Sequence, residues 1–187
     1  SGIGIAYLRM GANYWAAQYF QKALAQDPNF TDARVGMGMV MYEDGECNET
    51  LRYLAPLYGE RWESSEIVSR IADCHVQLGN ASAAIPILKR SVDAGTRDGS
   101  LYAALMEVYF LEKRKQEALQ VYDQYKDRFP QIALTQLRVG TMLKDMGRVD
   151  NARAVLTSIS KDPKYGKVAQ QTLKELEGTS TPPVQKP

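Results

Sequence analysis

Two glycines in the stretch GMGMVMYEDG, Gly36 and Gly38, have the spacing that begins a phosphate-binding loop. Such a loop needs the pattern G-x-G-x-x-G between a strand and a helix, because glycine lets backbone N–H groups approach an anion. Met41 stands where the third glycine should be, and the preceding NFTDAR does not have the composition of a strand. The sequence therefore gives no support to a nucleotide site.

Other candidates for catalytic or metal chemistry are few. His75 is the only histidine, and with Cys47 and Cys74 it cannot complete a zinc site unless carboxylates join it. No nucleophile elbow, P-loop or metalloprotease motif is present in the sequence. We therefore expect no enzyme active site, no metal and no cofactor in these residues, and we interpret His75 as a packed side chain.

Composition excludes some partners as well. The chain has 187 residues, of which 44% are hydrophobic and 24% charged, and its net charge is +1. No block of basic residues favours nucleic acid or an anionic membrane surface. The longest apolar runs are far shorter than a membrane-spanning helix. The opening SGIGIAY reads as the middle of a helix, so we expect these residues to be part of a longer chain.

A repeat of 34 residues organises the sequence. Glycines recur at 11, 45, 79 and 147, with Lys113 at the missing step. Small residues stand at 16, 50, 84, 118 and 152, and large apolar residues at 20, 54, 88, 122 and 156. Each repeat holds two runs of apolar residues with helical spacing, separated by a polar turn. Because one helical hairpin cannot bury its own apolar face, we expect successive hairpins to stack.

These columns resemble the tetratricopeptide repeat family, whose signature is W-x2-L-G-x2-Y, then A-x3-F, then P. The first repeat matches best, with Ile3-Gly4-x2-Tyr7, then Ala16-x3-Phe20, then Pro28. The resemblance implies an all-α fold, a right-handed α-solenoid of helix-turn-helix repeats that ends in a capping helix. It covers about residues 1–163 and says little about the ligand.

The repeat register divides the chain into five units, a cap and a tail. The units are predicted at 1–30, 31–64, 65–98, 99–132 and 133–163, the capping helix at 164–178 and a flexible tail at 179–187. The cap is expected to bury Tyr165, Val168, Ala169, Thr172 and Leu176 on one face. Pro56 stands inside the second helix of its unit, so we expect a kink or an early stop there.

The resemblance also points to a binding surface, because in this family the first helix of each unit lines the concave face. One column on those helices holds Leu8, Tyr42, Val76, Phe110 and Lys144, and a neighbouring column holds Ile5, Met39, Asp73, Glu107 and Thr141. We interpret them as an apolar groove with an acidic middle that suits an amphipathic helix or an extended peptide. The predicted partner-binding residues are Ile5, Leu8, Met39, Tyr42, Val76 and Phe110. The alternative is that these side chains only pack between adjacent helices.

A non-catalytic scaffold that binds a protein or peptide partner is the function that this surface favours. The short array and the proline-containing tail are similar to tetratricopeptide lipoproteins of bacterial pilus assembly, which implies a periplasmic or outer-membrane-associated location. The alternatives are the regulatory repeat region of a larger enzyme and a cytoplasmic location.

Two cysteines bear on that location. Cys47 is expected at the start of one helix and Cys74 near the end of the next, and consecutive helices run antiparallel, so the thiols are expected to be neighbours. A disulfide between them would indicate an oxidising compartment. Two buried free thiols are the other interpretation, because free cysteine is among the most buried residue types.

Overall fold

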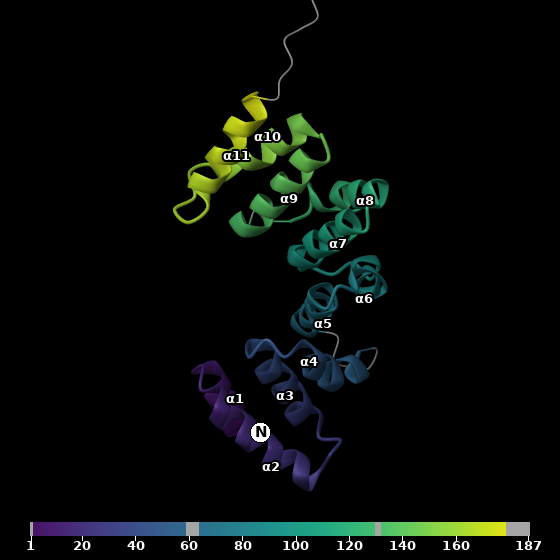
Figure 1. Cartoon of the computed structure of the whole chain (residues 1–187), viewed down its shortest axis with the longest axis vertical. Helices are drawn as coiled ribbons and strands as arrows, with labels where there is room; N and C mark the ends of the chain where they lie inside the picture. The colour runs from purple at the N-terminus through teal and green to yellow at the C-terminus, as the bar shows by residue number, and fades with distance from the viewer. Residues whose placement is uncertain (1, 59–63, 130–131, 179–187) are drawn as a thin grey trace, which may run out of the picture. The chain divides into compact units, whose positions relative to one another are not determined.

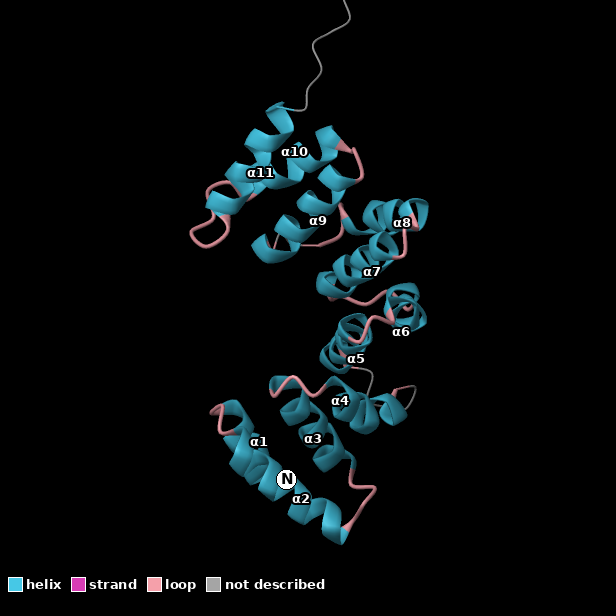
Figure 2. Ribbon diagram, viewed as in Figure 1, coloured by secondary structure: helices cyan, strands magenta, loops and turns pink. Residues whose placement is uncertain are grey.

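The computed structural model describes residues 2–58, 64–129 and 132–178, and the predicted tail at 179–187 lies outside these ranges. The described residues form helices joined by turns and short loops, with no strand among them (Figures 1 and 2). The all-α prediction is therefore confirmed. None of the described helices has both the length and the apolar composition needed to cross a membrane.

The helices alternate in two series that follow the 34-residue step. The first helix of each hairpin is α1 (Gly2–Arg9), α3 (Thr31–Glu43), α5 (Ser65–Gln77), α7 (Gly99–Leu111) or α9 (Ala133–Asp145). The second is α2 (Asn13–Gln26), α4 (Cys47–Leu54), α6 (Ala81–Asp93), α8 (Lys115–Tyr125) or α10 (Val149–Ser158), and α11 (Gly166–Gly178) follows the last hairpin. The division into five repeats stays our proposal, and the helices beginning at Thr31, Ser65, Gly99 and Ala133 start at its boundaries.

The turns inside the hairpins each contain a residue with a positive φ angle, in the left-handed region of backbone conformation. Gly11, Gly45, Gly79 and Gly147 have φ between 70° and 79°, and Lys113 takes the same position with φ 59°. A left-handed residue after a helix lets the next amide groups bond back to the last free carbonyls. These residues therefore end the first helices and reverse the chain, as the glycine column predicts.

The chain forms two compact units, residues 1–96 with α1 to α6 and residues 97–187 with α7 to α11. We call them unit 1 and unit 2. In unit 1 the ring of Phe20 on α2 is fully buried, in a cluster with Ala16, Ala33, Met37 and Val40. Packing of α2 against α3 thus supplies the apolar burial that one hairpin lacks.

Proline 56 changes the second hairpin in the way predicted. Helix α4 ends at Leu54, and a 3₁₀ turn follows over Ala55–Leu57 with Pro56 in it. A proline cannot donate the backbone hydrogen bond that a continuing α-helix needs. The predicted irregularity at 55–64 can be followed only to residue 58, because residues 59–63 lie outside the described ranges.

Helix α11 packs on α9 and α10 in unit 2. It buries Ala169, Thr172 and Leu176, as expected of a cap. Val168 differs from the prediction, because its side chain is 53% exposed. It lies instead beside a pocket described below.

Candidate functional site: pockets on the first helices

The six predicted partner-binding side chains lie on α1, α3, α5 and α7, and each is half-buried. Ile5, Leu8 and Met39 share a pocket in unit 1, and Phe110 lines another in unit 2. Tyr42 is held by neighbouring polar side chains, and Val76 lines neither pocket.

The pocket in unit 1 lies between α1 and α3 and has a volume of about 400 Å³. Its apolar lining consists of Ile5, Leu8, Val35, Gly36 and Met39. The charged side chains around it are Arg9, Asp32 and Glu66, the last from the start of α5. An apolar cavity with few charged groups at its edge is the usual form of a ligand pocket.

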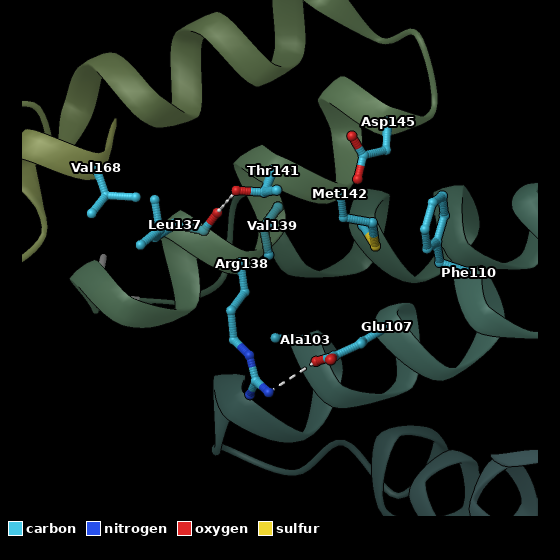
Figure 3. A pocket seen from close by; sticks show the side chains of 10 residues that line it. All are labelled: Ala103, Glu107, Phe110, Leu137, Arg138, Val139, Thr141, Met142, Asp145 and Val168. Carbon is cyan, nitrogen blue, oxygen red and sulfur yellow. Dashed lines mark hydrogen bonds and ion pairs between the residues drawn. The ribbon is translucent and has the colours of Figure 1, made fainter. Parts of the chain in front are cut away.

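The pocket in unit 2 has a volume of about 330 Å³ and is lined by side chains of α7, α9 and α11 (Figure 3). Figure 3 shows the side chains of Arg138 and Glu107 pointing toward each other, and their ion pair is 3.1 Å long. Asp145 also lines the pocket. The Thr141 hydroxyl donates to the carbonyl of Leu137 at 2.9 Å, so its proton is not directed at a ligand.

The two pockets occupy the same repeat positions. Phe110 follows Leu8 by three 34-residue steps, and Leu137 follows Val35 and Thr141 follows Met39 by the same interval. Glu107, Arg138 and Val168 correspond in this way to Ile5, Gly36 and Glu66. The two sites therefore use equivalent repeat positions and differ in side chains.

Between α3 and α5 the chain's own side chains bond to each other at the equivalent positions, and we call this a closed site. The Tyr42 hydroxyl donates to the Asp73 carboxylate at 2.5 Å, and the Arg70 guanidinium lies 4.4 Å from the centre of the Tyr42 ring. Gln77 donates to the same carboxylate at 2.7 Å. Burial, with the hydrogen bond to Asp73, raises the pKa of Tyr42 to about 12. Tyr42 is therefore fixed in place.

A second closed site lies between α9 and α11. The Lys144 ammonium donates to the Glu175 carboxylate at 2.7 Å, and this hydrogen bond raises the pKa of Lys144 and lowers that of Glu175. Tyr42–Asp73 and Lys144–Glu175 are each separated by 31 residues and occupy the same two repeat positions. At the open sites those positions hold Leu8 with Met39 and Phe110 with Thr141.

These sites suit binding better than catalysis, because their linings are mainly apolar. Within the described ranges no three side chains of the types His, Cys, Asp and Glu lie together in a way that could hold a metal ion. His75 lies half-buried on α5, and burial lowers its pKa.

Solved structures identify the fold. A thermophilic TPR protein of Thermus thermophilus aligns with a TM-score of 0.67 and 18% identity, over 94% of this chain and 95% of its own. YrrB, described as a TPR protein with an unusual peptide-binding site, aligns with a TM-score of 0.72 and 18% identity, over 92% of this chain and 89% of its own. The chain has the tetratricopeptide-repeat fold.

Two further comparisons give one more solved structure and one family model. The pilF protein of Pseudomonas aeruginosa aligns with a TM-score of 0.55 and 17% identity, over 93% of this chain and 95% of its own. Residues 59–131, less than half of the chain, match the family described as the bacterial transcriptional activator domain. No curated protein matches the sequence.

The sequence columns missed most of the unit 2 pocket. Leu137, Met142 and Val168 line it, and the repeat register assigned none of them to the groove. The sequence does carry a different pattern, because at two sites residues 31 positions apart form a hydrogen-bonded pair. Comparing residues 31 positions apart in the sequence distinguishes the polar pairs Tyr42–Asp73 and Lys144–Glu175 from the pairs Leu8–Met39 and Phe110–Thr141.

The two cysteines are free thiols in the structure, and both are buried. The Cys47 thiol donates to the side-chain carbonyl of Gln77 at 3.4 Å. Burial raises the pKa of Cys74, and the adjacent Cys47 thiol raises it further. The thiols are thus neighbours, as the register predicts, and the disulfide itself stays a prediction.

Proposed function

We propose that the chain is a non-catalytic scaffold that holds a segment of a partner protein against the first helices of its hairpins. The pocket of unit 1 carries the proposal, because Ile5, Leu8 and Met39 line it together and three charged side chains surround it. Apolar side chains of a partner would lose contact with water there, at roughly 25 cal/mol per Å² of apolar area buried. The charged edge would orient the segment.

The closed site between α9 and α11 provides the test variant. Lys144 and Glu175 occupy the repeat positions of Leu8 and Met39, so Leu8→Lys with Met39→Glu copies a natural closing pair into the open pocket. We expect this double variant to bind peptides at least tenfold more weakly, which corresponds to about 1.4 kcal/mol. Peptides selected from a random 12-residue display library on the purified chain serve as probes, and fluorescence polarisation measures their binding.

A matched control places the same two charges on α2. Gln21→Lys with Ala25→Glu changes two exposed positions outside the pocket, and peptide binding should stay within twofold of the unmodified chain. Circular dichroism and thermal unfolding check that both variants fold. If the selected peptides bind the pocket variant as tightly as the control, or if no peptide is enriched, this pocket is not a peptide site.

For the setting, we propose a bacterial envelope complex of the pilus or secretion type, with the chain in the periplasm or at the outer membrane. The structural similarity to pilF of Pseudomonas aeruginosa supports this setting. The alternatives are the regulatory repeat region of a larger enzyme and a cytoplasmic location. The match of residues 59–131 to the bacterial transcriptional activator domain supports the cytoplasmic location.

The cysteines distinguish the two settings. In an oxidising compartment we expect Cys47 and Cys74 to be joined, because their thiols are neighbours and disulfides persist there. Mass spectrometry of protein taken from its native compartment, alkylated in denaturant without a reductant, should then find neither thiol labelled. Two labelled thiols would contradict both the disulfide and the envelope setting. Protein reduced before alkylation is the control and should carry two labels.

A further inference from the structure

We infer that the unit 2 pocket is a second binding site for the same class of ligand as the unit 1 pocket, so that one chain binds two amphipathic, positively charged peptide segments. This inference rests on the proposed function of the unit 1 pocket. Each pocket is complete within its own unit, because all its lining residues belong to that unit. The ligand places an apolar side chain in the pocket and a lysine or arginine at its edge.

Repeat equivalence is the first support. The wall made by Leu8 and Val35 in unit 1 is made by Phe110 and Leu137 in unit 2, three repeats later. Met142 and Val139 extend the apolar lining in unit 2. The two volumes, about 400 and 330 Å³, are of the same size class, and each lies at the lower end of the range for ligand pockets.

The closed sites are the second support, because in each of them a polar pair of the chain itself bridges the two equivalent positions. Between α9 and α11 a single polar pair, Lys144 with Glu175, takes the two positions that stay apolar between α1 and α3. Between α3 and α5, Tyr42 and Asp73 do the same. Phe110 and Thr141 form no such pair, since the Thr141 hydroxyl bonds to the carbonyl of Leu137. The Thr141 hydroxyl therefore does not bridge these two positions in the unit 2 site.

Charge selects the class of segment. In unit 1 the pocket is lined by Asp32 and Glu66 with one cation, Arg9. Arg70 lies 3.7 Å from the Glu66 carboxylate, but it is shared with Glu43 at 3.9 Å. In unit 2 the Glu107 carboxylate is paired with Arg138, which leaves Asp145 as the excess charge. Figure 3 shows Asp145 on the same side of this pocket as Phe110 and Met142. Both pockets thus combine an apolar lining with one more carboxylate than cations, which favours a basic group on the ligand.

Stoichiometry tests the inference. Isothermal titration calorimetry with the display-selected peptide should give two peptides per unmodified chain and one for the Leu8→Lys, Met39→Glu variant. Phe110→Lys with Thr141→Glu, which copies the Lys144–Glu175 pair into unit 2, should also give one, and the four changes together none. Replacing the lysines or arginines of the peptide by glutamate should weaken binding roughly tenfold, because favourable charge pairs become repulsive ones.

Control variants separate site loss from unfolding. Gln120→Lys with Gln124→Glu adds the same charges to exposed positions of α8 and should keep two sites. Thr141→Arg fills the pocket while Phe110 keeps its contacts, and it should also remove one site. One peptide per unmodified chain, with binding unchanged by Phe110→Lys, Thr141→Glu, would overturn the second site and leave the unit 1 proposal intact. Equal binding of the glutamate peptide would overturn the charge preference.

Discussion

Replacing Phe20 with alanine is expected to lower the free energy of unfolding of unit 1 by about 3–5 kcal/mol, the usual cost of removing a buried phenylalanine ring. The Phe20 side chain is fully buried. Its ring lies against the backbone of both α1 and α3, because a Cβ added at Gly4 or at Gly36 would lie 2.7 or 2.3 Å from a ring atom. The cavity left by alanine would lie where α1, α2 and α3 meet. We expect the neighbouring side chains to fill little of this cavity, so most of the lost packing energy is not recovered.

Urea denaturation followed by circular dichroism measures this loss. Met10→Ala is the control, because the Met10 side chain is 77% exposed and its removal should change stability by no more than about 0.5 kcal/mol. If Phe20→Ala costs no more than Met10→Ala, the ring does not join α1, α2 and α3 in the way described.

Adding one methyl group at Gly36 is expected to destabilise unit 1 by about 1 kcal/mol net, although alanine is a better helix former than glycine. The helix preference favours the substitution by about 1 kcal/mol. Against it, the added Cβ would lie 2.3–2.5 Å from three atoms of the Phe20 ring, closer than real Cβ contacts. Forcing an extra methyl group into a packed core typically costs about 1–3 kcal/mol, and Phe20 is enclosed on all sides. Overpacking therefore outweighs helix preference here.

Thermal and urea unfolding of Gly36→Ala measure the effect. Gly2→Ala makes the same change in α1 where no neighbouring atom lies within 4 Å, so it should be neutral or slightly stabilising. Combining Gly36→Ala with Phe20→Leu should cost less than the sum of the two single changes, because the smaller side chain leaves room for the methyl group. Strict additivity would show that Gly36 and Phe20 do not contact each other.

Much of the fold could be predicted from the sequence because its determinants are local. The glycine column fixed the hairpin turns, and Lys113, the exception in that column, adopts the same left-handed conformation. Pro56 indicated where α4 would end. Each of these signals depends on backbone preferences of one or two residues, so a single sequence carries it.

The site could be predicted only in part, because an open or closed pocket depends on how two distant side chains meet. Leu8 and Met39 were recognised from their columns, and they do share a pocket. Tyr42 has the same column and the same size of side chain as Phe110, yet its hydroxyl bonds to Asp73 and Arg70 covers its ring. The repeat position of a residue does not show whether its side chain is bonded to a neighbour or lines a pocket.

The residues that form pairs 31 positions apart are different from the residues of the buried small and large columns. This difference affects how such a chain can change over evolutionary time. The pair positions at Tyr42–Asp73 and Lys144–Glu175 are half-buried or exposed, whereas the small and large columns at Ala16 and Phe20 are fully buried. A duplicated hairpin would inherit its stability through the buried columns, and two substitutions at the pair positions would then decide whether the new copy accepts a ligand. Ligand specificity could in this way diverge repeat by repeat, with selection for folding and selection for recognition acting on different residues.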